Sequence, residues 1–75
     1  MYSMEKFHIR AYGKSELAQC YSPDISVSAA RRKLMRWIDF HPTLVASLTA
    51  QGFTEKIRTF SPAQVQLIVD ALGEP

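Results

Sequence analysis

The hydrophobic positions of the chain recur at spacings that predict helices. In the clearest segment, residues 27–39, apolar residues three and four positions apart share one face, and polar residues occupy the other. Ser26 precedes this segment as an N-cap residue. The apolar face consists of Val27, Ala30, Leu34, Trp37 and Ile38. We therefore expect one amphipathic helix, with Trp37 in core packing.

Two neighbouring segments carry weaker helical signals. A short helix is expected over 14–21, with Cys20 on its apolar side as a buried structural thiol. Another is expected over 42–50, where Pro42 suits the first helical position. Gly52 stands where a glycine commonly follows a helix C-terminus. These two helices would flank the long amphipathic one.

The C-terminal segment opens with a strong helix start. Ser61 and Gln64 can form a capping box, and Pro62 takes the first helical position. Phe60 and Val65 stand at the positions of a hydrophobic staple. The expected buried stripe consists of Val65, Ile68, Val69 and Leu72.

Two segments have the character of short strands. Within residues 7–12, Phe7, Ile9 and Ala11 alternate with more polar neighbours, and residues 56–60 predict a second strand. The two strands should pair, since a lone strand leaves its backbone groups unpaired. The expected fold class is mainly α: four short helices and a small two-stranded antiparallel ribbon, in the order strand, helix, helix, helix, strand, helix.

Length and composition narrow the function. The chain has 75 residues, enough for one domain over 1–75, with residues 1–6 expected to fray. A domain of this size has few positions to spare for an enclosed catalytic cleft, so we expect no enzyme, no cofactor and no small-molecule substrate. The lone cysteine and the lack of a signal peptide or an apolar run of about 18 residues favour a cytoplasmic protein without a membrane segment.

Charge adds one local feature. The net charge of +2 does not by itself indicate a nucleic-acid partner. Four of the nine basic residues, however, fall within residues 31–36 with no acid among them. They are Arg31, Arg32, Lys33 and Arg36. Such a cluster either binds phosphates or is simply a solvated helix face.

The stretch from Glu16 to Leu34 resembles the bacterial helix-turn-helix family. Motifs of that family commonly begin Glu-Leu-Ala, as in residues 16–18, and continue with Val-Ser, for which Ile25-Ser26 stands here. Ala29-Ala30, Arg32 and Leu34 follow at the family's offsets. The turn departs from the pattern, because Ser22 replaces the usual glycine and Pro23-Asp24 resembles an insertion.

This resemblance implies a helix-turn-helix core whose second helix enters the DNA major groove. The later strand near residues 56–60 is also similar to a winged-helix or excisionase-like arrangement, in which a basic hairpin contacts the DNA backbone. The implied phosphate contacts are Arg31, Arg32, Lys33, Arg36, Lys56 and Arg58, and the implied base contacts are Ser28, Ala29 and Arg32. The protein would then be a DNA-binding regulator or a mobile-element accessory factor. The alternative is a protein-interaction adaptor or self-dimer on the same helical frame.

Most of the chain also resembles a group of short bacterial proteins, known chiefly from Bacteroides-type gut bacteria, that form a domain family of unknown function. The shared motifs are a Tyr-Gly-Lys-Ser-Glu-Leu-Ala opening, an Arg-Arg-x-x-x-x-Trp-Ile helix, a Phe-Ser/Thr-Pro-x-Gln-Val run and a Gly-Glu-Pro ending. Here they occupy residues 12–18, 31–38, 60–65 and 73–75. The resemblance covers about residues 12–75 and implies no activity.

Catalytic or metal chemistry has little support in the sequence. His8 and His41 lack further ligands at a spacing typical of metal sites, so no metal is expected. Glu16 and Asp24 have nothing that fixes their separation, and Glu16 is better explained as a favourable charge at a helix start. Cys20 with a histidine would make a nucleophilic pair only if the thiol were accessible, which its apolar position opposes.

Overall fold

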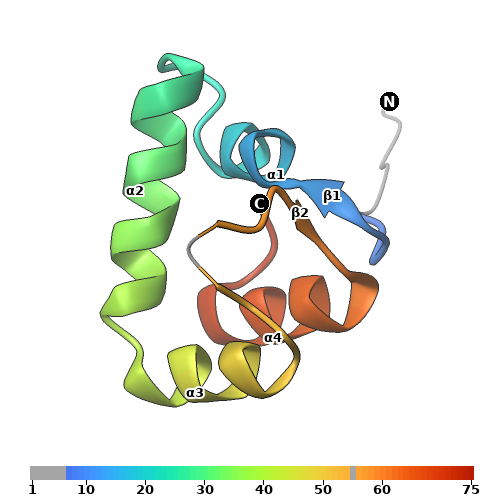
Figure 1. Cartoon of the computed structure of the whole chain (residues 1–75). Helices are drawn as coiled ribbons and strands as arrows, with labels where there is room; N and C mark the ends of the chain where they lie inside the picture. Colours follow the sequence, from blue (N-terminus) through green and yellow to red (C-terminus); the bar gives the residue numbers. More distant parts are fainter. Residues whose placement is uncertain (1–6, 55) are drawn as a thin grey trace.

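Four helices and a two-stranded antiparallel sheet make up the described part of the chain (Figure 1). The structure is a computed structural model that describes residues 7–54 and 56–75, so the expected fraying of residues 1–6 lies outside it. The order of elements is the predicted one. In chain order they are β1 (Tyr12–Gly13), α1 (Lys14–Tyr21), α2 (Val27–Asp39), α3 (Pro42–Ala50), β2 (Thr59–Phe60) and α4 (Pro62–Leu72).

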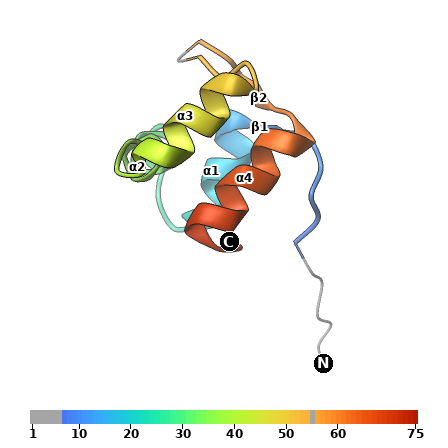
Figure 2. The ribbon, with the colours of Figure 1, turned by 90° about the horizontal axis from the view of Figure 1, so that it is seen from below.

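The long helix α2 runs along one side of the domain. It packs against α1 and α3, while α3 also packs against α4, and the small sheet links α1 to α4. Figure 1 shows α2 standing at the left edge, and Figure 2 shows α3 and α4 side by side beneath the sheet. This arrangement buries one face of α2 and leaves its opposite face to solvent.

A single hydrophobic core joins all four helices. Its largest fully buried side chains are Phe60, Leu17, Leu34, Ile38, Leu48, Ile68 and Val65. Each contributes about 1.5–3 kcal/mol by leaving water. The predicted stripe of α4 is confirmed at Val65 and Ile68, whereas Val69 and Leu72 are only partly buried.

The predicted helix starts are confirmed in detail. Ser26 Oγ accepts a hydrogen bond from the Ala29 amide at 3.2 Å. At the start of α4, Ser61 Oγ accepts from the Gln64 amide at 3.2 Å, and Gln64 Oε1 accepts from the Ser61 amide at 2.8 Å. The buried Gln64 side chain also donates to the Gln51 carbonyl at 2.9 Å, so this capping box ties α4 to the end of α3.

The strand predicted over 7–12 is wrong in its length and in which of its side chains are buried. Only Tyr12 and Gly13 are paired, with Tyr12 opposite Phe60, and Tyr12 is 5% exposed whereas Ile9 is 40% exposed. The Tyr12 hydroxyl donates to the His8 carbonyl at 2.8 Å, and the Phe7 ring stacks on the Tyr12 ring. An irregular segment with a bend at Arg10, stabilised by aromatic contact, therefore replaces an extended strand, and the tyrosine ring takes the buried position.

The second strand is likewise shorter than the predicted 56–60. It consists of Thr59 and Phe60, so Lys56 and Arg58 lie in the irregular segment that precedes it. Because β1 and β2 are separated by three helices, the ribbon is not a hairpin. No hairpin wing is present within residues 7–54 and 56–75.

Two side chains expected inside the domain are exposed. Cys20 is exposed rather than buried, because it lies about 110° around α1 from the midpoint of the buried Leu17 and Ala18, at 100° per residue. Val27, the first residue of α2, is 44% exposed beside the turn from α1. The packed face of α2 therefore begins at Ala30.

Candidate nucleic-acid interface

The solvent face of α2 carries the basic cluster. Ala30, Leu34 and Ile38 are buried on one side of the helix, and all four basic residues of α2 are exposed. Three of the four, Arg31, Arg32 and Arg36, lie on the side that faces the segment before β2 and the start of α1, where they line surface hollows.

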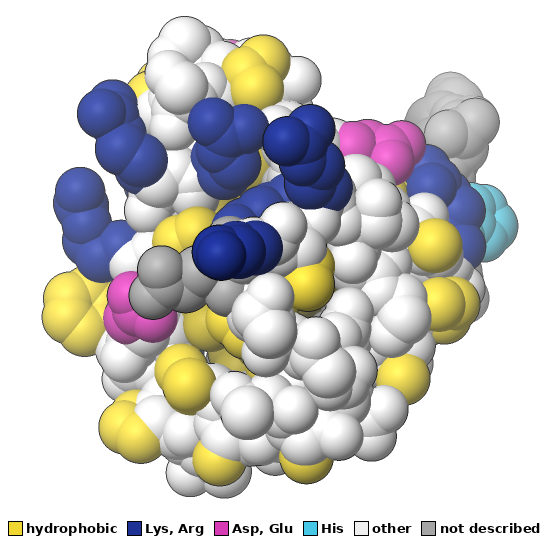
Figure 3. All heavy atoms as spheres, viewed as in Figure 1, with side chains coloured by type: hydrophobic (Ala, Val, Ile, Leu, Met, Phe, Trp, Pro, Cys, Tyr) yellow, Lys and Arg dark blue, Asp and Glu magenta, His cyan; other side chains and the backbone are white. Residues whose placement is uncertain are grey.

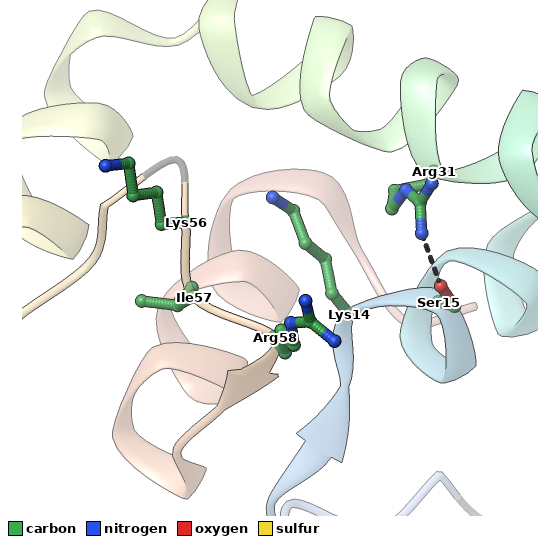
Figure 4. A pocket seen from close by; sticks show the side chains of 6 residues that line it. All are labelled: Lys14, Ser15, Arg31, Lys56, Ile57 and Arg58. Carbon is green, nitrogen blue, oxygen red and sulfur yellow. Dashed lines mark hydrogen bonds between the residues drawn. The ribbon is translucent and has the colours of Figure 1, made fainter.

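The first of these hollows joins three segments of the chain (Figure 4). It has a volume of about 440 Å³ and lies between the first turn of α1, α2 and the segment before β2. Its wall consists of Lys14, Ser15, Arg31, Lys56, Ile57 and Arg58. Four of these six side chains are cationic, so the hollow favours an anionic ligand.

Backbone pairing places the cations of this hollow together. The Lys14 amide donates to the Arg58 carbonyl at 2.7 Å, next to the β1–β2 pairing, and this fixes the segment before β2 beside α1. On the other side, Arg31 Nη1 donates to Ser15 Oγ at 3.1 Å, as Figure 4 shows. The side chains of α1 and α2 are thereby tied across the hollow.

A second hollow extends the same surface along α2. It has a volume of about 430 Å³ and shares Lys14 and Arg31 with the first. Its other walls are Arg32, Met35, Arg36 and Asp39. The two hollows together are lined by six of the nine Lys and Arg residues of the chain, which we call the basic face. They are Lys14, Arg31, Arg32, Arg36, Lys56 and Arg58.

Charge is unevenly distributed over the molecule. Asp39 is the one acidic side chain that the described residues contribute to these two hollows, and Glu55, next to Lys56 in sequence, lies outside the described residues. Helices α3 and α4 contain no Lys or Arg. Figure 3 shows most of the basic side chains gathered over α2 and in front of it, with further basic atoms toward the right of the view and none over its lower part. One half of the domain is therefore basic and the other nearly neutral.

The remaining predicted contact residues are not part of the basic face. Lys33 lies on the opposite flank of α2, with Nζ 5.2 Å from the centroid of the Trp37 ring. Ser28 and Ala29 occupy the first turn of α2 and line neither hollow. Lys14 belongs to the face although no sequence pattern marks it, because its place depends on the pairing of β1 with β2.

The flank that carries Lys33 is built around aromatic side chains. Trp37 is half-buried and packs against the core, in agreement with the core packing expected of it. The Tyr21 ring meets it edge-on, with centroids 6.1 Å apart, and the Tyr21 hydroxyl donates to the Gly73 carbonyl. Partial burial raises the pKa of Tyr21 to about 12. This flank therefore has a structural role in joining α1, α2 and the end of α4.

Arg10 is basic but already engaged. Its Nη2 lies 2.9 Å from Glu16 Oε2, and its guanidinium group lies over the Tyr12 ring at 3.8 Å. Glu16 Oε1 also accepts from the Gly13 amide at 3.0 Å, which confirms Glu16 as a helix-start residue. The hydrogen bond from Arg10, followed by that from Gly13, lowers the pKa of the Glu16 carboxyl group.

The lowered pKa of Glu16 predicts that the stability of the fold depends on pH. A carboxyl group with a depressed folded-state pKa stabilises the fold above its unfolded pKa of about 4.3, and this contribution is lost as pH falls through the folded-state value. We expect Arg10→Ala to move the pKa of Glu16 upward in a carboxyl-carbon NMR titration and to make thermal stability less sensitive to pH in this acidic range. An unchanged Glu16 titration in Arg10→Ala would contradict the assignment.

An apolar hollow adjoins the basic face. It has a volume of about 470 Å³ and shares Lys14, Met35 and Asp39 with the second hollow. The rest of its wall comes from α3 and the residues that follow it: Val45, Thr49, Phe53 and Thr54. The three hollows thus form one continuous surface that changes from basic to apolar.

No three His, Cys, Asp or Glu side chains gather in a possible metal site within residues 7–54 and 56–75. In the same ranges, none of the helices has the length and apolar character that crossing a bilayer requires.

The fold and its surface define a small, mainly helical domain with one basic face. The sequence model of the family described as a domain of unknown function (DUF4248) matches residues 8–75, and the chain belongs to this family. The match agrees with the resemblance to a domain family of unknown function over about residues 12–75. Comparisons with curated proteins and with solved structures gave no match.

Proposed function

We propose that the protein binds DNA through the basic face, with α2 as the recognition helix of a helix-turn-helix. The observation that carries this proposal is the convergence of six cations from three segments of the chain on two adjoining hollows. Four of the six are arginines, whose planar guanidinium groups form paired hydrogen bonds with phosphate oxygens. The backbone of DNA carries regularly spaced phosphate groups that could bind these arginines.

The packing of α1 on α2 supports the helix-turn-helix interpretation. Ala18 and Ala30 are both buried, and small residues at these positions allow the two helices to approach closely. The N-terminal half of α2 presents Ser28 and Arg32 to solvent, where base edges would be contacted. The segment with Lys56 and Arg58 would contact the backbone beside α2, as a wing does, although it is not a hairpin.

The proposed partner sets further expectations. A single small module commonly binds DNA weakly unless it dimerises or acts with another protein. We therefore propose that the protein acts as a two-fold dimer or as an accessory factor, as a regulator or a mobile-element factor would. DNA binding and the free thiol of Cys20 both fit a cytoplasmic protein.

Fluorescence anisotropy of a labelled duplex tests the proposal. Contacts with up to six phosphates give a slope of log affinity against log salt of up to about −5, so binding should fall steeply between about 50 and 200 mM salt. We expect Arg32→Ala together with Arg36→Ala to weaken binding and make the slope shallower by about 2. Unchanged affinity in this double variant would reject the assigned face.

A protein-interaction adaptor is the second candidate. Among the residues that the structure describes, four large apolar side chains are exposed, with Phe40 at 72% the most accessible of them. The others are Ile9, Ile25 and Val27. Absence of DNA binding by the folded protein at low salt would favour this candidate over DNA binding.

A further inference from the structure

The apolar hollow beside the basic face has the features of a binding site for a flat ring. Met35, Val45 and Phe53 line it, and all three are half-buried. The Phe53 ring stacks on the buried Phe60 ring, with centroids 6.0 Å apart and planes 14° apart. The Phe53 amide also donates to the Leu48 carbonyl at 2.9 Å. The aromatic wall of the hollow is therefore held in place by the core.

The edge of this hollow is polar. Asp39, Thr49 and Thr54 are exposed there. Thr49 Oγ1 donates to the Val45 carbonyl at 2.8 Å, which leaves its oxygen free to accept. Thr54 Oγ1 accepts from the Lys56 amide at 3.3 Å, which leaves its proton free to donate. The edge thus offers both donors and acceptors to a ligand with polar atoms on its rim.

We propose that this hollow receives one unstacked nucleobase of a nucleic acid whose phosphates lie on the basic face. The inference rests on the DNA-binding function proposed above and specifies the form of the ligand. A nucleotide combines a flat ring that stacks on aromatic and apolar side chains with an anion close to that ring. The continuity of the apolar hollow with the cationic ones, through shared Lys14, matches this combination.

The proposal predicts a preference for unpaired nucleotides. In a duplex each base is stacked and paired, so occupying the hollow requires a base to be extruded at a cost of a few kcal/mol. A single strand, or a duplex with an unpaired segment, avoids this cost. Binding would therefore be tighter to unpaired DNA than its phosphate count alone explains.

An abasic oligonucleotide separates the base from the phosphates. We would measure anisotropy at about 50 mM salt with labelled oligothymidylate of about 15 nucleotides and with an abasic strand that carries the same number of phosphates. The expected result is roughly fivefold or tighter binding of oligothymidylate. Phe53→Leu should abolish this difference, because it keeps an apolar side chain against Phe60 but removes the aromatic surface. Phe40→Leu, the same change outside all three hollows, should preserve it.

The outcomes distinguish this inference from the proposed function. Equal affinity of the wild-type protein for both strands would overturn the proposed nucleobase site but not phosphate binding by the basic face. Failure to bind either strand or a duplex would overturn both the nucleobase site and the proposed DNA-binding function. If circular dichroism shows that Phe53→Leu is unfolded, Thr49→Tyr, at an exposed site on the hollow wall, should fill the space and abolish the difference instead. Equal affinity for both strands, together with tight binding of an alternating Glu-Leu peptide that Phe53→Leu abolishes, would assign the hollow to a protein partner and overturn the inference.

Discussion

Phe60→Ala is expected to remove most of the stability of the domain. Phe60 is fully buried, belongs to β2, stacks on Phe53 and precedes the capping box of α4. Truncation of a buried phenylalanine costs about 3–5 kcal/mol, through lost transfer free energy and the cavity that remains. Domains have a free energy of unfolding of about 5–15 kcal/mol, and a chain this short falls toward the lower end. Urea unfolding monitored by far-UV circular dichroism and Trp37 fluorescence would measure the loss.

Phe40→Ala provides the matched control. Phe40 follows α2 and is 72% exposed, so the same truncation leaves no cavity and should change the free energy of unfolding by no more than about 0.5 kcal/mol. Comparable losses in the two variants would show that Phe60 does not have the core position described for it. A small loss in Phe60→Ala alone would mean that β1, β2 and α4 can repack around the cavity.

Helix boundaries could be predicted because local chemistry determines them. Ser26, Ser61 and Gln64 satisfy the free backbone groups at helix starts within a few residues of themselves, so the sequence contains all the required information. The strands could not be predicted to the same accuracy. Their extent depends on which residues meet across 45 positions of the chain, and alternation over residues 7–11 was outweighed by the packing of the Tyr12 ring.

The sequence also could not determine which face of a short helix is buried. Helix α1 has eight residues, and its periodicity is equally compatible with a buried face that includes Cys20 and with one centred on Leu17 and Ala18. The choice is made by the elements that cover the helix, here α2 and β1, which contact it. The exposed thiol of Cys20 is the consequence.

The candidate site was predicted as the surface of one basic helix supported by Lys56 and Arg58, whereas the structure shows a face made from three segments. The cluster at 31–36 marked α2 correctly as basic, yet Lys33 turns toward Trp37 and Lys14 joins the face from α1. The sequence could not show this, because the position of Lys14 beside Arg58 follows from a backbone hydrogen bond between the first residue of α1 and the segment before β2, next to the pairing of β1 with β2. Membership of the face, rather than of the helix, should decide which cations matter for binding.

Arg58→Glu is therefore expected to weaken DNA binding more than Lys33→Glu does. Both changes shift the net charge by the same amount, but Arg58 lies off α2 and on the basic face, whereas Lys33 lies on α2 and off that face. Replacing an attraction of about 1 kcal/mol at 4 Å with a similar repulsion gives roughly a thirtyfold loss for Arg58→Glu at low salt. Lys33→Glu should lose less than about threefold, because Lys33 lines neither hollow and its charge acts on the bound DNA through water, where salt screens it. Anisotropy titrations with one duplex would compare them, and a larger loss in Lys33→Glu would mean that DNA contacts the opposite flank of α2.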